Sequence, residues 1–477
     1  DEAYSVYIAR QGFADIPRLL ANYDTHPPLH YALLHLWMRL FGSSEVAVRL
    51  PSVLASLGVV ALTWRLARNI AGETAAAVAA AFIALSPFQI MSAQEARMYP
   101  FLTLFGLAAS FALWSLADGA EGKGSRLWIF YAAAMALALY THHFAFLLLV
   151  AHGVYVVLVD RRRPMLRTWS LAAAAVLLAY LPLAPALYTQ VVTARGWPDI
   201  RPPFGAVALT DLLGMLSFGG GLFGMGTYFR RGTLLMEYRA AVLLPFLLLL
   251  AAGVAALADR RRRDFILLYW LFPVLALSAL SVRWNMFYER YFSFVLPPFA
   301  VLMGAGVVSI AGVMATWWKR ALAFGGLLAL VGAFAIPSLI DNYRAGTPYN
   351  WRAVAQHVRD EARPTDFILY VPAFARIPFE YYYQGPQQRM SVNPAEVIGP
   401  RREVTFRTRV DPQRFAAIAR THPRMWIVAT IPIGYDARKE IAKVLAPYFR
   451  EKAGTSFGLV YAFLWESRVY DASGSRR

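Results

Sequence analysis

Cysteine is absent from the 477-residue chain, which excludes a disulfide framework, a thiolate metal site and a cysteine nucleophile. This absence leaves the cellular compartment open. Charged residues are also scarce, since they form 16% of the chain against roughly 25% in soluble domains. Hydrophobic residues, by contrast, make up 58% of the chain and aromatic residues 14%. This balance indicates an integral membrane protein.

Phosphate-binding loops and internal repeats are also lacking. The C-terminal region has no Gly-rich phosphate loop, so nothing indicates a nucleotide-binding domain. The lack of a repeat counts weakly against transporter folds. The net charge is +18, but the basic residues do not form one patch. They lie in short runs between apolar segments, which is typical of membrane topology and not of nucleic-acid binding.

Apolar segments that could span a membrane follow one another along the first 340 residues. The ten predicted spans are 46–66, 74–93, 100–117, 126–140, 143–159, 168–189, 238–258, 264–282, 291–315 and 320–340. The fourth and fifth are short and form either a tight hairpin or one longer irregular span. Residues 27–41 are too few to cross roughly 30 Å of hydrocarbon, so we expect an interfacial helix there.

Lys and Arg predict the orientation, because they favour cytoplasmic loops. They follow the odd-numbered spans, at Arg65, Arg68, Lys123, Arg126, Arg161–Arg163, Arg167, Arg260–Arg263, Lys319 and Arg320. The opposite face then carries Asp1, the 190–237 loop and the C-terminal tail. A chain that starts outside needs an earlier span, so we expect one N-terminal helix before Asp1. The predicted location is a bacterial plasma (inner) membrane, crossed many times, with the active site external or periplasmic.

The C-terminal residues 341–477 predict an external α/β domain with a largely parallel sheet, because helical and strand-like patterns alternate. The expected helices are 351–363, 411–421 and 437–452, and the expected strands are 367–372, 425–430 and 455–465. The first domain, residues 1–340, is the predicted transmembrane catalytic domain and includes an external loop and interfacial helix at 1–45. The Gly- and Pro-rich 190–237 loop is either a disordered connection or a lid over the site.

Acidic and histidine side chains come first among the candidate functional residues. Asp1 and Glu2 form a carboxylate pair that could act as a base, a metal ligand or an electrostatic group. The alternative is two solvated acids at a chain end. His26, shortly after Asp24, stands where a loop enters the interfacial helix and could contact a phosphate or a metal. The alternative is an interfacial histidine without a role.

Ionisable residues near the outer ends of the spans form the second group. Glu95 and Arg97 lie in SAQEARMYP (92–100), where charge near membrane depth is costly and tends to mark function. Arg290 precedes a span beside tyrosines, and arginine suits bidentate phosphate contact as well as interfacial anchoring. His142 and His143 could bind a metal with Glu2, but no HxxxH spacing supports it, and interfacial packing is the alternative.

These groups all fall on the predicted outer face, which suits one reaction. A carboxylate base deprotonates an acceptor hydroxyl, the hydroxyl attacks an anomeric carbon, and cationic groups stabilise the departing phosphate. Nucleotide sugars are not available outside, so the donor would be lipid-linked. The candidate substrate-binding residues are His26, Arg97, Tyr99, Arg290 and Tyr291.

The ordered set of motifs resembles bacterial members of the GT-C glycosyltransferase superfamily. It is similar to the protein O-mannosyltransferase type (family 39) and to the related lipopolysaccharide glycosyltransferases and aminoarabinose–lipid A transferases. The motifs are Asp1-Glu2, HPPLHY (26–31), SAQEARMYP (92–100) and ERYFSFVLPP (289–298). The resemblance is strong over roughly the first hundred residues and weak over the C-terminal domain. It implies a GT-C fold of α-helical membrane spans.

The resemblance also implies a mechanism and roles for individual residues. The donor would be a polyprenyl-phosphate sugar, and the reaction an inverting single displacement. Asp1 matches the family's general base, Glu2 its neighbour that binds or orients, and Glu95 its second acidic position. His26 stands where some relatives have lysine near the donor phosphate, so that contact becomes pH-dependent. Some relatives bind a divalent cation, which makes one a possible cofactor here.

Two other classes of protein compete with the glycosyltransferase. A polytopic transporter or flippase of lipid-linked sugars would favour ionisable residues on both faces or in mid-span. A non-catalytic envelope assembly protein would tolerate loss of the acids. The expected partners are the lipid bilayer, the lipid-linked donor and an acceptor lipid, glycan or protein. The sequence does not identify the sugar or the acceptor.

Overall fold

Two compact units make up the chain in the computed structural model. The structure describes residues 2–23, 26–119, 124–193, 204–219, 239–284, 286–314, 316–344, 349–392, 412–430 and 442–470. Ile8–Tyr343 pack together as the first unit. The second unit contains Arg344–Arg477 together with Glu2–Tyr7. Each unit is described below by itself.

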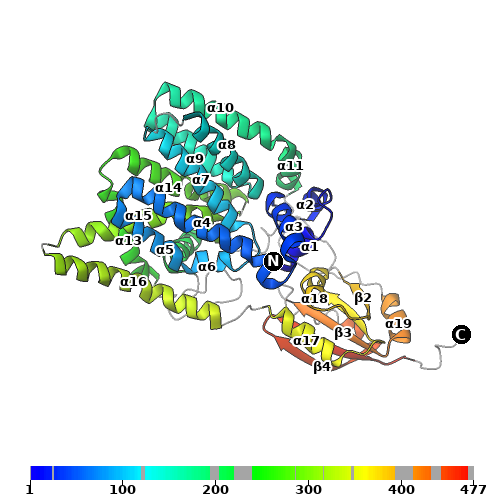
Figure 1. Cartoon of the computed structure of the whole chain (residues 1–477). Helices are drawn as coiled ribbons and strands as arrows, with labels where there is room; N and C mark the ends of the chain where they lie inside the picture. The colour runs from blue at the N-terminus through cyan, green and yellow to red at the C-terminus, as the bar shows by residue number, and fades with distance from the viewer. Residues whose placement is uncertain are drawn as a thin grey trace. The chain divides into compact units, whose positions relative to one another are not determined.

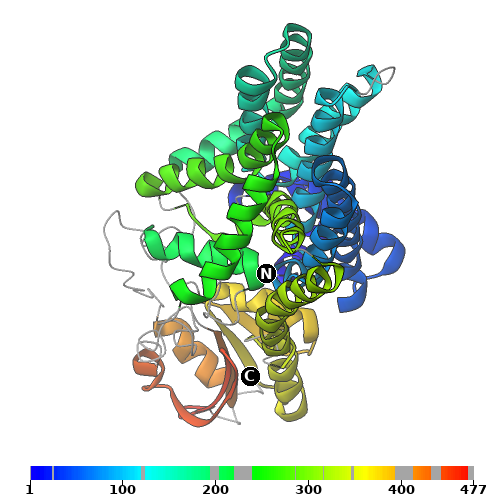
Figure 2. The ribbon, with the colours of Figure 1, turned by 90° about the vertical axis from the view of Figure 1, so that its left-hand side faces the viewer.

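The first unit is helical (Figures 1 and 2). Its helices before residue 160 are the end of α1 (Glu2–Ala9), α2 (Ile16–Tyr23), α3 (Leu29–Phe41), α4 (Glu45–Ala71), α5 (Glu73–Leu85), α6 (Pro87–Ala93), α7 (Tyr99–Ala117), α8 (Gly124–Thr141), α9 (Ala145–Tyr155) and η1 (Val156–Asp160). The later ones are α10 (Arg163–Tyr180), η2 (Leu181–Leu183), α11 (Ala184–Thr193), α12 (Ala206–Phe218), α13 (Arg239–Ala256), α14 (Arg260–Trp284), η5 (Glu289–Val295), α15 (Leu296–Gly312) and α16 (Trp317–Arg344).

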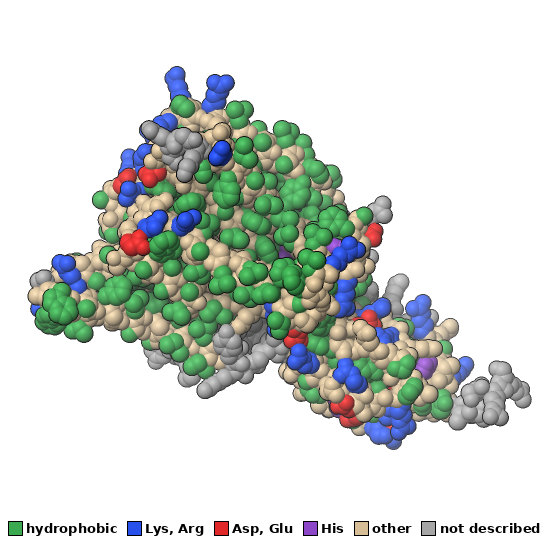
Figure 3. All heavy atoms as spheres, viewed as in Figure 1, with side chains coloured by type: hydrophobic (Ala, Val, Ile, Leu, Met, Phe, Trp, Pro, Cys, Tyr) green, Lys and Arg blue, Asp and Glu red, His purple; other side chains and the backbone are tan. Residues whose placement is uncertain are grey.

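Six helical segments in the described residues are long and apolar enough to cross a membrane. The pair α5 and α6, bent by 55°, makes a seventh if it counts as one span. Each of the ten predicted spans overlaps helix, but three of them rest on helices outside this set: α8, the segment Ala145–Asp160 and α13. The chain is therefore a multi-pass membrane protein, and the number ten stays a prediction. Figure 3 shows hydrophobic side chains over most of the visible face of this unit, as lipid contact requires.

Helix α15 is largely buried in the unit: the segment Glu289–Gly312, formed by η5 and α15, has 83% of its most apolar window buried inside the protein. It approaches α13 closely through Gly306 and Gly253, where an added Cβ would overlap the backbone carbonyl of Leu249 or Leu302. Gly304 makes a similar approach to Ala75 of α5. Small residues allow this because helix association in lipid depends on close packing and not on a hydrophobic driving force.

The ends of several odd-numbered spans meet at one face of this unit. The buried carboxylate of Asp160 accepts hydrogen bonds from Arg162 (2.8 Å) and Arg261 (2.6 Å). Both guanidinium groups also donate to the carbonyl of Ala117, at 2.8 and 2.9 Å. Loops predicted to share one side of the membrane therefore do share one face. Which side of the membrane this face occupies stays a prediction.

The 190–237 segment contains more regular structure than predicted. Residues 206–218 form α12, whose C-terminal half is buried, so a structureless connection is wrong for this part. The Phe204 ring lies 5.0 Å from that of Phe287, and the Phe218 ring lies 5.5 Å from that of Phe246. A run of apolar residues at helical spacing explains the helix. The rest of the predicted lid lies outside the described residues, apart from the end of α11 and the residues next to α12 at 204, 205 and 219.

The second unit is an α/β domain with a five-stranded sheet in the order β2-β1-β3-β5-β4. Its elements are α17 (Trp351–Glu361), β1 (Phe367–Val371), η6 (Ala373–Ala375), α18 (Arg376–Tyr382), β2 (Gln388–Ser391), α19 (Pro412–Thr421), β3 (Arg424–Thr430), β4 (Phe449–Phe457) and β5 (Val460–Ser467). The cores on the two sides of the sheet differ: α17 and α18 cover one face and α19 the other. Strand β1 is buried throughout because helices cover both its faces.

Three predictions about this domain need correction. The sheet is mixed and not largely parallel, since β1 pairs parallel with β2 and β3 but β5 pairs antiparallel with β3 and β4. The predicted helix 437–452 is wrong at its end, because β4 begins at Phe449. The predicted strand 455–465 is a hairpin, in which Gly458 turns the chain with φ +72°. Only glycine adopts that conformation without strain.

Candidate active site

The junction between α6 and α7 carries the central ion pair of the helical unit. Ser86 caps α6 by accepting a hydrogen bond from the Gln89 backbone, and α6 ends at Ala93. The chain then bends and re-enters helix at Tyr99, with proline in the first turn of α7. Glu95 lies in this bend and accepts a hydrogen bond from Arg290 Nη1 at 2.9 Å. The two side chains are 26% and 17% exposed, so solvent still reaches the pair.

Arg97 lies two residues further along the same bend and is 7% exposed. Its carbonyl accepts a hydrogen bond from Ser52 Oγ of α4 at 3.3 Å, which fixes the bend against that helix. Its guanidinium is near enough to interact electrostatically with Tyr99 and Arg290. Two guanidinium groups therefore lie close together, and the Glu95 carboxylate offsets part of their charge.

Tyrosines surround these charges. Tyr99 is 4% exposed and interacts electrostatically with Tyr288 and Tyr291. The rings of Tyr288 and Tyr291 lie 5.2 Å apart at 81°. Burial raises the pKa of Tyr288, while the Arg290 guanidinium lowers it. The phenol of Tyr288 is thus kept neutral, so its oxygen carries a proton that it can donate.

His142 joins the HPPLHY motif to this cluster. Its ring lies 5.4 Å from that of His26 and 5.1 Å from that of Tyr291, with Tyr99 at 6.3 Å. His30 fixes the other end of the motif, since its Nε2 lies 3.1 Å from the carbonyl oxygen of Ala96. Segments from α3, the α6–α7 bend, the α8–α9 junction and η5 therefore meet in one place.

The metal candidates do not form a ligand set within the described residues. His143 does not join His142, because its Nδ1 lies 2.6 Å from the hydroxyl of Tyr180. Glu2 begins α1 and belongs to the C-terminal unit. No group of three or more His, Asp or Glu side chains in the described parts of the chain could hold a metal ion.

The structure brings together six of the predicted site residues: His26, Glu95, Arg97, Tyr99, Arg290 and Tyr291. It adds His142 as a packing partner of this cluster. Asp1 and Asp24 lie outside the described residues, so the general-base assignment stays a prediction, as does the role of Glu2.

Tyr288 was not selected from the sequence, although it interacts electrostatically with Glu95, Arg290 and Tyr291. Its position two residues before Arg290, in an aromatic-rich segment that enters a span, is the signal that could have identified it. His30 is another omission, since a second histidine in HPPLHY was a visible polar interruption of an apolar helix. His30 is buried and Tyr288 half-buried at a junction of helices, where a polar side chain requires a partner.

The cluster combines groups of two kinds. The guanidinium groups of Arg97 and Arg290, with neutral phenols beside them, are suited to bind phosphate oxygens. The Glu95 carboxylate can orient Arg290 or accept a proton. A site with cationic and carboxylate groups at the end of membrane helices suits a substrate whose headgroup is anionic and whose tail is apolar.

Comparison with known proteins assigns the fold. Residues 25–188 match the model of the family described as dolichyl-phosphate-mannose-protein mannosyltransferase. The structure is similar to ArnT from Cupriavidus metallidurans in the apo state, with a TM-score of 0.61, 15% identity, and coverage of 97% of this chain and 93% of that one. The same enzyme bound to undecaprenyl phosphate gives a TM-score of 0.58 at 16% identity, with the same coverage.

A second similar structure is the oligosaccharyltransferase AglB from Archaeoglobus fulgidus, in complex with an inhibitory peptide and a dolichol-phosphate. It gives a TM-score of 0.55 at 13% identity, with coverage of 96% of this chain and 70% of that one. No curated protein matches the chain significantly in sequence. ArnT and AglB are GT-C glycosyltransferases, so the GT-C fold expected from the motifs is confirmed. The chain therefore shares the fold of these two enzymes, and its residues 25–188 match the mannosyltransferase family model.

Proposed function

We propose that this chain is a membrane glycosyltransferase of the GT-C type and that it transfers a sugar from a polyprenyl-phosphate-linked donor to an acceptor hydroxyl. The observation that carries the proposal is the Glu95–Arg290 pair beside Arg97, Tyr99 and Tyr291. The chain has the fold of ArnT, which has been solved with undecaprenyl phosphate bound, and of AglB, solved with a dolichol-phosphate. Donors of that kind place a phosphate where membrane helices end.

The proposed reaction is an inverting single displacement. Asp1 removes the proton of the acceptor hydroxyl, whose oxygen forms a bond to the anomeric carbon. The bond between that carbon and the phosphate oxygen breaks, and the polyprenyl phosphate leaves with the bonding electron pair. Glu2 orients the acceptor or the base.

Among the described residues are cationic groups that can stabilise the departing polyprenyl phosphate. Arg97 and Arg290 donate to the phosphate oxygens, where negative charge increases as the bond breaks. Glu95 holds Arg290 in position through its 2.9 Å hydrogen bond. His26 contacts the phosphate when protonated, and Tyr99 and Tyr291 line the place where the sugar–phosphate lies.

The site and the C-terminal domain are proposed to face the outside of a bacterial plasma membrane. The contact of Asp160 with Arg162 and Arg261 supports part of this arrangement, because it places basic loops together at one face of the helical unit. Basic loops are favoured on the cytoplasmic side. The acceptor is a lipid, a glycan or a protein.

Two substitutions test the reaction. Asp1→Asn removes the proposed base, and Glu95→Gln removes the charge that holds Arg290. Transfer from a radiolabelled polyprenyl-phosphate sugar is measured in membranes of cells that express the full-length protein. We expect each variant to lose about 10²–10⁴-fold in rate, the range for general base catalysis and for preorganised charge. Wild-type transfer by Asp1→Asn would exclude it as the base, and absence of transfer by the wild-type protein with any such donor would refute the proposal.

A further inference from the structure

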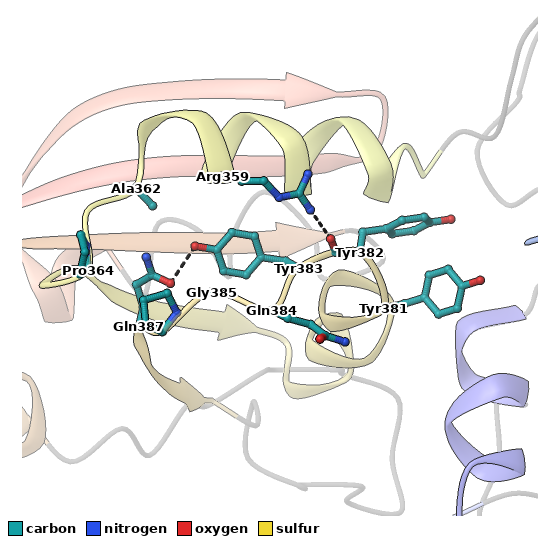
Figure 4. A pocket seen from close by; sticks show the side chains of 10 residues that line it. Arg359, Ala362, Pro364, Tyr381, Tyr382, Tyr383, Gln384, Gly385 and Gln387 are labelled. Carbon is teal, nitrogen blue, oxygen red and sulfur yellow. Dashed lines mark hydrogen bonds between the residues drawn. The ribbon is translucent and has the colours of Figure 1, made fainter. Parts of the chain in front are cut away.

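A cavity of about 550 Å³ opens in the C-terminal α/β domain, separate from the cluster in the helical unit. It lies between the end of α17 and the segment that follows α18 (Figure 4). The volume falls within the roughly 300–1,000 Å³ of small-molecule sites. Its lining comes mainly from a run of consecutive residues, Tyr381–Gln387.

The floor of this cavity is held by a chain of hydrogen bonds. The buried Tyr383 donates its hydroxyl proton to Gln387 Oε1 at 2.7 Å. Gln387 Nε2 donates in turn to the carbonyl of Arg363 at 3.1 Å. Gly385 lies against this pair so closely that an added Cβ would overlap both Tyr383 and Gln387. The floor is therefore preorganised, which lowers the entropy cost of binding a ligand.

Aromatic and polar side chains form the walls. The rings of Tyr381 and Tyr382 lie 4.8 Å apart at 82°, and both are half-buried, so they make a corner (Figure 4). The Arg352 guanidinium lies over the Tyr382 ring at 5.8 Å, a cation–π contact that helps to fix its orientation. The amide of Gln384 is exposed at the rim.

Arg359 supplies the charge of the site. Its guanidinium donates to the carbonyl of Tyr382 and to Gln356 Oε1, the latter at 2.5 Å. Both acceptors are neutral, and no carboxylate of the described residues lies within salt-bridge distance of it. Its positive charge is therefore not cancelled locally, and it can polarise or bind ligand oxygens.

We propose that this cavity binds a saccharide. A pyranose ring has a face of C–H bonds that packs on the electron-rich face of a tyrosine ring, and its edge carries hydroxyl groups that both donate and accept. The exposed Gln384 amide also donates and accepts hydrogen bonds, and the Arg359 guanidinium adds N–H groups that donate to sugar oxygens. A lipid tail or an apolar peptide would leave these polar groups without partners, which is costly. The volume suits about two sugar residues.

The role that follows is recruitment of a glycan acceptor, and this part of the inference rests on the proposed function. A glycosyltransferase that binds its acceptor away from the reacting hydroxyl raises the effective concentration of that acceptor. Of the acceptor classes left open by the sequence, the cavity favours a glycan. Saccharide binding itself does not depend on the transfer reaction.

Binding is measured on the full-length protein in detergent, by saturation-transfer NMR and titration with mannobiose and cellobiose. Tyr382→Ala removes the ring but keeps the carbonyl that Arg359 contacts, so the floor stays in place. Gln384→Ala changes an exposed side chain and serves as a second variant. Tyr470→Ala is the matched control, because Tyr470 is 40% exposed and does not line the cavity. We expect about a tenfold or greater loss of affinity in the first two variants and none in the control.

The outcomes separate this inference from the proposed function. The inference fails if the wild-type protein binds neither disaccharide, or if Tyr382→Ala and Gln384→Ala bind them as well as the wild type does. Glu95→Gln should retain disaccharide binding while it loses transfer, because Glu95 belongs to the helical unit. Saccharide binding without any transfer by the wild-type protein would support the saccharide site and refute both the reaction and the recruitment role.

Discussion

Arg290 is the residue on which most of the described site depends. It forms the hydrogen bond to Glu95 and interacts electrostatically with Tyr288, Tyr99 and Arg97. Lysine in its place keeps the charge but loses the planar set of donors that can bind a carboxylate and a phosphate together. We expect Arg290→Lys to reduce transfer by about 10²-fold, the effect of losing one preorganised donor. Transfer from the lipid-linked donor in membranes is the measurement.

A double-mutant cycle makes that test specific. If Glu95 acts by holding Arg290, then Glu95→Gln and Arg290→Lys together should cost little more than either alone, since both remove one interaction. Additive losses would contradict the positioning role. Arg283→Lys is the matched control, because Arg283 is exposed at the end of α14, close in sequence to the same junction.

His422 predicts a pH dependence of stability in the C-terminal domain. Burial lowers its pKa below the ordinary value of about 6.5, and its ring packs edge-on against Phe367 at 5.2 Å. Between the folded pKa and about 6.5 the unfolded chain binds a proton that the folded chain does not, so stability falls as pH falls through that window. The thermal stability of this domain within the full chain is measured by limited proteolysis during heating, with cleavage sites assigned by mass spectrometry.

The expected result is a lower unfolding temperature at about pH 5.5 than at about pH 7.5. His422→Gln should reduce this difference, because glutamine does not titrate. A pH dependence that is unchanged in His422→Gln would assign the effect to other groups.

Charged side chains near the ends of spans could be assigned to one site from the sequence, but their pairing could not. Glu95, Arg97 and Arg290 were grouped because membrane topology placed them on one face. The His142 ring packs beside that of His26, whereas His143 is hydrogen-bonded to Tyr180. These different partners depend on how four helices pack, and the periodicity of the sequence does not encode that packing. Tyr288 could have been selected from its position two residues before Arg290, but its place beside Glu95 and Arg290 depends on the same packing.

The contact between α13 and α15 is the element-scale feature with the sharpest consequence. Gly306→Ala places a Cβ against the carbonyl of Leu249, where backbone cannot move aside as a flexible side chain could. We expect destabilisation of about 1–3 kcal/mol or more from overpacking. Thermal stability of the detergent-purified protein, followed by fluorescence-detected size exclusion, reports the change.

Gly325→Ala in α16 is the control for that substitution. Nothing lies within 4 Å of an added Cβ there, and alanine favours helix over glycine by roughly 1 kcal/mol. Its stability should therefore equal or exceed that of the wild type. Equal destabilisation by both changes would show that the α13–α15 contact is not specific.

Elements were predictable where periodicity and length agreed. Helices α17 and α19 and strands β1 and β3 were predicted close to their observed bounds because each has a single clear pattern. The β4–β5 hairpin was read as one strand, since an apolar run continues through Gly458 and only its positive φ turns the chain. The parallel and antiparallel pairings depend on connections that the strand patterns do not specify.

At the scale of the whole molecule, the sidedness of the chain is open to a direct test. Asp160 contacts Arg162 and Arg261, and both arginines also donate to the carbonyl of Ala117. Arg262 donates to the carbonyl of Ile70 at 3.4 Å. These contacts bring together the ends of the first, third, fifth and seventh predicted spans. These contacts agree with the distribution of Lys and Arg, which follow the odd-numbered predicted spans. They fix which loops share a face, and the inside-positive bias predicts that this face is cytoplasmic.

The chain contains no cysteine, so a thiol-reactive label attaches only at a cysteine introduced by mutation and reports that one position. Ser125→Cys lies at the start of α8, on the predicted cytoplasmic side, and Gln384→Cys lies in the C-terminal domain; both positions are exposed. A maleimide that does not cross membranes should label Gln384→Cys in intact spheroplasts and label Ser125→Cys only after permeabilisation. The reverse pattern would invert the topology, and it would exclude an external lipid-linked donor as the substrate, because the site residues lie at the membrane face opposite the basic loops.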